Sequence, residues 1–179
     1  VQDAQPAVAA VDLDGLAEVF ARPEVWAFPY GRAFTRDETA HFLDAQLAEW
    51  EECGFGCWIA LLEETQQPIG YVGLSVPMFL PEILPAVEVG WRFDPACWGQ
   101  GFATEGALAA LREGFTTLGL SEICSLPQSA NPASYRVCER IGMTFLQAEV
   151  YRRFHHYDEA IPRYVDLIEH HPGHETAYY

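Results

Sequence analysis

The chain of 179 residues is half hydrophobic and carries a formal net charge of −16 at pH 7. This size and composition predict a single globular domain over residues 1–179, and no apolar run approaches the roughly 20 residues that a membrane span requires. The acidity argues against nucleic acid as a partner, because phosphate binding requires basic surface, and it either serves solubility or favours cationic amines.

The basic and sulfur-bearing side chains exclude several kinds of catalytic and binding site. Every basic side chain is an arginine, which excludes a Schiff-base lysine and a Walker-type lysine. The five cysteines are odd in number and show no paired CxxC spacing, so we expect neither a disulfide framework nor a zinc site. The N-terminus shows no signal-peptide pattern, and we therefore expect a cytoplasmic protein with reduced cysteines.

The first third of the chain predicts two helices joined by an aromatic segment. Apolar residues at helical spacing indicate a helix over 12–21, and residues 26–34 indicate a loop that either lines a site or simply packs. Thr35 and Glu38 form a capping box, which opens a helix that ends at Gly54. The apolar face of that helix consists of Phe42, Leu43, Leu47 and Trp50.

Three strands are expected next. The runs over 57–62 and 68–76 are separated by a polar turn, which predicts a hairpin. Residues 77–85 contain three prolines and indicate a loop. The third strand, over 86–93, ends before Pro95, because proline cannot donate to a strand ladder.

The region after this strand predicts a crossover. A helix is expected over 101–118, followed by a short strand over 122–126. Parallel pairing of that strand with 86–93 requires the intervening helix. The helix residues expected to face inward are Ala107, Leu108, Leu111 and Phe115.

The last part predicts one more helix and a hairpin. Asn131 as N-cap and Pro132 in the first turn open a helix over 131–140. The runs 143–154 and 163–169 indicate a long closing hairpin, whose exposed aromatics leave a homodimer open.

The stretch from Glu88 to Gly106 is the centre of the chain's chemistry. Gly99 and Gly101 allow positive φ and close approach of a ligand, and the next helix points its free N–H groups at this loop. The loop therefore predicts a phosphate or pyrophosphate site. A dinucleotide turn would need a GxGxxG run and an acidic residue ending the next strand. The run after residue 125 is Leu-Pro-Gln and contains no acid, which argues against a dinucleotide site.

Two motifs in this part of the chain carry a family resemblance. The segment 94–105 resembles the acetyl-CoA loop of GNAT acetyltransferases, Arg/Gln-x-x-Gly-x-Gly/Ala, with Trp98 in place of the first residue. The segment 131–143 resembles the partner motif of that family, in the Asn-x-x-Ser version of the RimJ/RimL branch. The resemblance implies an α/β (mixed α+β) GNAT fold: a mostly antiparallel twisted sheet with two splayed parallel strands, flanked by helices.

The resemblance also implies a set of cofactor contacts for acetyl-CoA. The backbone of Trp91 and Phe93 would pair with pantetheine, and Asn131 and Ser134 would face the thiol end. Cys138 stands where many members place a tyrosine that reprotonates the leaving thiolate, and Ser134 is the substitute. The amides that would hold the pyrophosphate belong to Trp98, Gly99, Gln100, Gly101, Phe102, Ala103 and Thr104.

The implied reaction is direct acyl transfer from a thioester to a neutral primary amine in a ternary complex. Glu88, on a mostly apolar strand, is the expected general base, and a backbone N–H near Trp91 would stabilise the oxyanion. Each candidate has a plain alternative: a strand carboxylate in solvent for Glu88, and a local helix cap for Ser134. A non-catalytic acyl-CoA-binding module also remains open.

The acceptor is expected to be a protein or peptide N-terminal amine, with a small-molecule amine such as an amino acid or antibiotic as the alternative. The acceptor cleft is expected to involve residues 26–34, 77–85 and the hairpin tip at 151–162.

Overall fold

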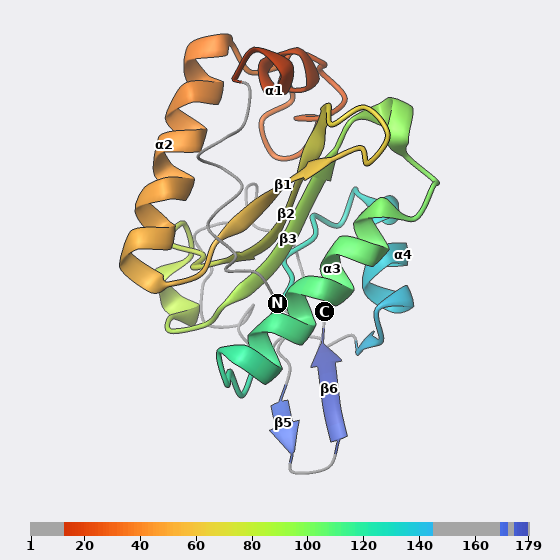
Figure 1. Cartoon of the computed structure of the whole chain (residues 1–179). Helices are drawn as coiled ribbons and strands as arrows, with labels where there is room; N and C mark the ends of the chain where they lie inside the picture. The colour runs from red at the N-terminus through yellow and green to blue at the C-terminus, as the bar shows by residue number, and fades with distance from the viewer. Residues whose placement is uncertain (1–12, 145–168, 172–173, 179) are drawn as a thin grey trace. The chain divides into compact units, whose positions relative to one another are not determined.

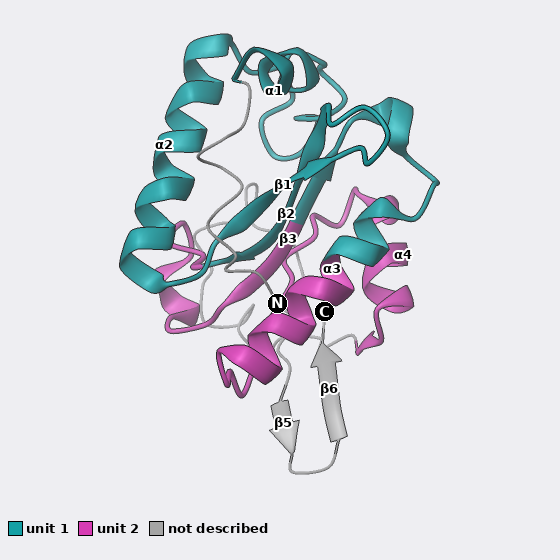
Figure 2. Ribbon diagram, in the orientation of Figure 1, with its two compact units in different colours: residues 1–75, 91–106 teal, residues 76–90, 107–179 magenta. Residues whose placement is uncertain are grey.

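The structure is a computed structural model that describes residues 13–144, 169–171 and 174–178. It comprises two compact units, shown in Figure 2. Unit 1 consists of Val1–Ser75 and Trp91–Gly106, and unit 2 of Val76–Gly90 and Ala107–Tyr179. Within the described residues, no helix is both long enough and apolar enough to cross a bilayer.

Unit 1 begins with the two expected helices. Helix α1 covers Leu13–Phe20 and α2 covers Arg36–Cys53, and α1 contacts both α2 and strand β2 (Figure 1). The predicted capping box is confirmed: the Thr35 hydroxyl accepts from the Glu38 amide, and the Glu38 carboxylate accepts from the Thr35 amide. Gly54 ends α2 in the left-handed conformation, where glycine is favoured.

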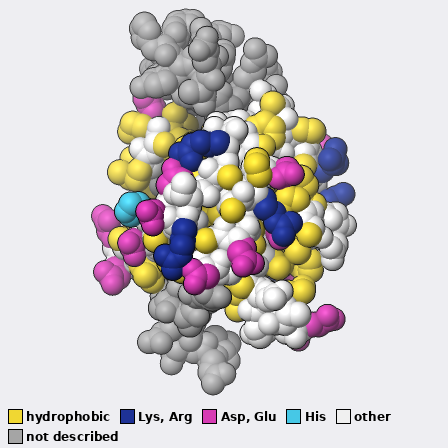
Figure 3. Space-filling view, turned by 90° about the horizontal axis from the view of Figure 1, so that it is seen from above, with side chains coloured by type: hydrophobic (Ala, Val, Ile, Leu, Met, Phe, Trp, Pro, Cys, Tyr) yellow, Lys and Arg dark blue, Asp and Glu magenta, His cyan; other side chains and the backbone are white. Residues whose placement is uncertain are grey.

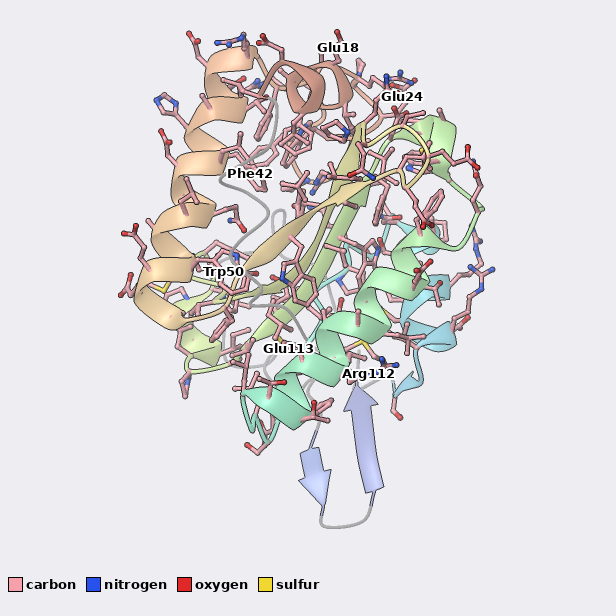
Figure 4. The ribbon with its side chains drawn as sticks, in the orientation of Figure 1. Glu18, Glu24, Phe42, Trp50, Arg112 and Glu113 are labelled. Atoms are coloured by element: carbon pink, nitrogen blue, oxygen red, sulfur yellow. The ribbon has the colours of Figure 1, made fainter. Side chains whose placement is uncertain are left out.

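The sheet of three strands follows. Strands β1 (Cys57–Leu61) and β2 (Pro68–Ser75) form the predicted antiparallel hairpin. Strand β3 (Glu88–Phe93) lies beside β2, so the order is β1-β2-β3, and the Asp94 amide donates to Ile69 O where this pairing ends. Figure 4 shows Trp50 on α2, and its indole donates to Cys57 O at the start of β1.

The core of unit 1 is an aromatic cluster centred on Phe20, which is fully buried. Phe20 makes edge contacts with four rings, at centroid distances between 4.9 and 6.1 Å. These rings belong to Trp26, Phe34, Phe42 and Tyr71. The expected inward face of α2 is confirmed for Phe42 and Leu43, which contribute to this core. The segment 26–34 therefore packs extensively, as well as approaching the end of β3.

Unit 2 contains the second half of the crossover. Helix α3 covers Phe102–Arg112 and continues as one π-helical turn over Glu113–Thr117, in which the Leu118 amide donates to Glu113 O. Arg112 and Glu113, at this transition, are labelled in Figure 4. Helix α4 covers Pro132–Arg140. Short 3₁₀ turns at Pro81–Ile83 in unit 2 and Pro95–Cys97 in unit 1 interrupt the loops on either side of β3.

Two expectations for this region were wrong in part. Leu108 is 43% exposed, although Ala107 and Leu111 are buried as expected. The buried stripe consists of Ala107, Ala110 and Leu111, and Leu108 lies about 100° around the helix from Ala107, at the edge of that stripe. Phe115 is half-buried.

The second wrong expectation concerns residues 122–126, which do not form a regular strand. Their parallel pairing with β3 consists of one bridge, Glu88 with Cys124. It is made by hydrogen bonds from Val89 N to Cys124 O and from Cys124 N to Val87 O. Burial of Ile123 and Cys124 accounts for the apolar run that suggested a strand.

Most of the expected hairpin over 143–154 and 163–169 lies outside the described residues, so it stays a prediction. Strand β4, Met143–Thr144, pairs in parallel with β6, His174–Tyr178. Strand β5, Glu169–His171, pairs antiparallel with β6. Residues 145–168, which include the expected hairpin tip at 151–162, lie outside the described residues.

Candidate acetyl-CoA site

The turn at the end of β3 is fixed by a buried carboxylate. Asp94 is 8% exposed, and its Oδ1 accepts from the Ala96 amide at 2.8 Å and forms an ion pair with Arg22 Nη1 at 2.9 Å. The Cys97 amide donates to Asp94 O, which completes a 3₁₀ turn. These bonds hold the chain in one conformation as it leaves the strand and enters the glycine loop.

Two further side chains brace the glycine loop. The Trp98 indole donates to Phe93 O at 2.8 Å, and the Gln100 amide group donates to Ala96 O at 3.0 Å. The Trp98 amide donates to Pro95 O, so this amide already has an acceptor. The indole ring itself is 54% exposed and offers an apolar surface beside the loop.

The glycine loop leaves a run of amides without acceptors. Gly99 and Gly101 have φ of +76° and +96°, and a Cβ on either would meet no atom within 4 Å. The first helical bond of this region runs from Glu105 N to Gly101 O. The amides of Gly99 to Thr104 therefore donate to no acceptor among the described residues, because the first N–H groups of a helix have no partner within it. This arrangement suits a phosphate or pyrophosphate group.

Glu88 is the expected base, and it lies at the start of β3. The residue is half-buried, and its backbone belongs to the single parallel bridge with Cys124. It is part of unit 2, where Val87 and Val89 on either side of it are buried. The carboxylate therefore projects from a strand whose neighbouring residues are apolar and buried.

Helix α4 carries the other expected site residues in unit 2. The Asn131 side chain accepts from the Ser134 amide at 3.2 Å, which makes it the N-cap of the helix. Ser134 is half-buried, while Cys138 is fully buried at 0% exposure. The Tyr135 hydroxyl donates to Pro127 O at 3.2 Å. Thus the first turn of α4 presents Ser134, and the thiol of Cys138 is enclosed by protein.

Arg92 is a residue whose prominence the sequence did not reveal. Its guanidinium carbon lies 4.0 Å from the centroid of the Trp26 ring, a cation–π contact. Its Nη1 donates to Val25 O and to Phe28 O, the latter at 2.7 Å, and its Nε donates to the Tyr71 hydroxyl at 3.4 Å. The signal that could have drawn attention to it was a second charged residue, besides Glu88, within a mostly apolar strand.

The chemistry of the remaining groups is limited. Burial and the nearby Asp94 carboxylate raise the pKa of the Cys97 thiol, so this thiol stays protonated at neutral pH. Across the part of the chain that the structure describes, no group of three or more His, Cys, Asp or Glu side chains is placed to hold a metal ion.

Comparison with known proteins agrees with the fold. Residues 5–144 match the family model described as an acetyltransferase (GNAT) domain. The chain is 32% identical over 154 residues to the FsC-acetyl coenzyme A-N(2)-transacetylase of Aspergillus fumigatus, a match that covers 78% of this chain. The chain spans 60% of that relative's length.

Solved structures agree with the fold. An acetyltransferase from Agrobacterium tumefaciens superposes with a TM-score of 0.68 at 26% identity, covering 94% of this chain and 89% of that one. The ribosomal L7/L12 α-N-protein acetyltransferase RimL, solved with coenzyme A, has a TM-score of 0.62 at 16% identity, covering 87% and 85%, which supports the fold alone. The chain belongs to the GNAT acetyltransferase family.

Proposed function

We propose that this chain, as a single GNAT domain of the RimJ/RimL type, transfers the acetyl group of acetyl-CoA to a primary amine. The observation that carries the proposal is the run of acceptor-free amides from Gly99 to Thr104 at the start of α3. Membership of the GNAT family indicates that the cosubstrate is acetyl-CoA. The acceptor amine attacks the thioester directly in a ternary complex.

The residues of the glycine loop fit the cosubstrate. The amides of Gly99 to Thr104 would hold the diphosphate, aided by the positive end of the α3 dipole. The exposed Trp98 ring would flank it, and the backbone of Trp91 and Phe93 would accompany the pantetheine arm. When bound, acetyl-CoA supplies an activated acetyl group and a thiolate leaving group.

The acceptor must lose a proton before it can attack. An N-terminal α-amine has a pKa of about 8, so holding it neutral at pH 7 costs roughly 1.4 kcal/mol, against roughly 4.6 kcal/mol for a lysine with a pKa near 10.4. An N-terminal amine therefore needs only a modest base. Glu88 takes this proton, directly or through water, from its half-buried place on β3.

The leaving thiolate must be reprotonated. Cys138 occupies the place of the tyrosine that many relatives use, and its burial keeps it from this role. Ser134, half-buried in the first turn of α4 with Asn131 capping its amide, supplies the proton. An amide near Trp91 stabilises the oxyanion that forms during attack.

The leading acceptor is a protein or peptide N-terminal amine, consistent with the RimJ/RimL resemblance. A cytoplasmic location accords with five free cysteines among the described residues. The homodimer remains a prediction from the sequence.

A direct assay tests the proposal. Thiol release from acetyl-CoA is measured with a panel of N-terminal peptides, amino acids and polyamines, and mass spectrometry identifies the acetylated nitrogen. Acetylation of a primary amine with equimolar CoA release supports the proposed reaction. Tight CoA binding without turnover of any amine would instead favour a non-catalytic acyl-CoA-binding module.

A further inference from the structure

Arg92 differs from every other arginine in the described part of unit 1. Arg22, Arg32 and Arg36 each lie within 3 Å of a carboxylate, belonging to Asp94, Glu38 and Asp14 respectively. Arg92 has no carboxylate partner among the described residues, and it is the least exposed of the four.

This lack of a partner is unexpected for such a chain. The protein has 26 acidic residues against 10 basic ones, so an arginine in this chain is expected to have a carboxylate partner. A half-buried cation without an anion loses hydration and gains no ion pair in return. Figure 3 shows acidic, basic and hydrophobic side chains interspersed over the face seen from above, as in an ordinary mixed surface.

The hydrogen bonds of Arg92 leave one edge of its guanidinium available. Nη1 is engaged by the carbonyls of Val25 and Phe28, and Nε by the Tyr71 hydroxyl. Nη2 has no acceptor within the described residues. The three bonds and the Trp26 ring hold the group in place, so its free edge is preorganised for an incoming acceptor.

A second donor at the same cluster also lacks an acceptor. Trp26 is 3% exposed, and its indole Nε1 is the one buried side-chain nitrogen or oxygen in the described residues without a hydrogen-bond partner. Buried N–H groups in native structures almost always find an acceptor in protein, water or ligand. This donor belongs to the ring that Arg92 covers, so the aromatic cluster holds a second N–H without an acceptor beside the cation.

We infer that Arg92 binds a carboxylate on the acceptor molecule, so that the preferred substrate is an amine that also carries an anionic group. The inference rests on the proposed acetyltransfer. Arg92 lies on β3, the strand that also carries the expected base Glu88 and leads into the glycine loop. The carboxylate is either the α-carboxylate of a free amino acid or an acidic side chain near a peptide N-terminus. In both cases Arg92 sets specificity and takes no part in proton transfer.

Matched substrate pairs test this inference in the wild-type protein. We would compare kcat/KM for a panel of L-amino acids with their C-terminal amides, and for peptides beginning Ala-Asp with those beginning Ala-Asn. The amide of an amino acid has the more acidic ammonium group and so holds more reactive neutral amine at a given pH. Chemistry alone thus favours the amide, and we expect the acid member of one pair type to be preferred by about tenfold or more.

Three variants assign the preference to Arg92. Arg92→Gln should raise KM for the acid substrate by about tenfold to a hundredfold, with kcat and the KM for acetyl-CoA nearly unchanged, and should abolish the acid-over-amide ratio. Arg92→Lys keeps the charge and should retain part of that ratio. It therefore separates loss of carboxylate binding from disruption of residues 25–28, whose carbonyls accept from Arg92. Arg36→Gln, an exposed arginine of the same unit, should leave the ratio unchanged.

The outcomes separate this inference from the proposed function. A preference in the amino-acid pairs assigns the α-carboxylate, and one in the peptide pairs assigns an acidic side chain. Equal turnover of acids and amides, or a preference that survives Arg92→Gln, would overturn the inference while leaving acetyltransfer intact. If no amine is acetylated, the proposed function fails, and calorimetric titration of the same acid and amide pairs decides whether Arg92 binds a carboxylate.

Discussion

Replacing Gly101 by alanine probes the glycine loop most directly. Gly101 has φ of +96°, and an added Cβ would meet no atom within 4 Å, so the change introduces backbone strain without a clash. A non-glycine residue at positive φ costs about 1–2 kcal/mol. If the loop must keep this conformation to present its amides to the diphosphate, that cost falls on binding. CoA affinity should drop roughly 5- to 30-fold.

The assay for Gly101→Ala is calorimetric titration with CoA, combined with thermal unfolding of the free protein. The matched control is Gly119→Ala, because Gly119 also has positive φ, +67°, with open space around it, and follows the π-helical turn after α3. Gly119→Ala should lower Tm by roughly 2–4 °C for each kcal/mol, and Gly101→Ala by less, because its loop relaxes in the free protein and the strain is imposed only when CoA binds. Only Gly101→Ala should weaken CoA. Unchanged CoA affinity in that variant, or equal weakening in both, would refute the assigned role of the loop.

Three further predictions address catalysis and stability. Glu88→Gln should lower kcat by about a hundredfold or more and remove the acidic limb of the pH–rate profile; an unchanged profile would remove Glu88 as the base. Ser134→Ala should slow turnover by about tenfold while CoA affinity changes less; equal losses would make Ser134 a positioning group. The Arg32 hydrogen bond holds the pKa of Glu38 at about 2, below the ordinary value of 4.5, so the stabilisation is complete above pH 4.5 and lost toward pH 2. The Tm difference between wild type and Glu38→Gln should shrink over that window, and a constant difference would contradict this.

Local signals made much of unit 1 predictable. The capping box at Thr35 and Glu38 and the Gly54 stop depend on residues within one turn of each helix end, so the sequence contains their full cause. The same holds for Asn131 and Pro132 at the start of α4. The turn at Asp94 was also expected, although its ion pair with Arg22 was not, because the partner lies 72 positions earlier in the chain.

Features that depend on tertiary contacts were not predictable. Leu108 is exposed because the buried stripe of the helix passes through Ala110 instead. Ala110 is small and weakly hydrophobic, so Leu108 had the stronger inward signal in the sequence. In the segment 122–126, Ile123 and Cys124 are apolar and buried, and burial alone does not specify a strand. Strands β5 and β6 carry little apolar alternation, and the turn signal between them, a Pro-Gly dipeptide in the sequence, was the available clue.

The prominence of Arg92 likewise arises from contacts that are distant in sequence. Its acceptors, Val25 O and Phe28 O, lie more than sixty positions away, and the Trp26 ring comes from the same distant segment. Glu18 and Glu24, which are labelled in Figure 4 and precede this segment in the chain, form no ion pair with Arg92.

One measurement addresses the central claim, that amides around Gly99 to Thr104 hold the diphosphate of CoA. Calorimetric titrations with CoA and with pantetheine, which lacks the nucleotide and its diphosphate, are compared at one salt concentration. We predict one CoA site per chain and a CoA affinity at least about tenfold higher than that for pantetheine. Equal affinities for the two ligands, or no detectable CoA binding, would contradict the account.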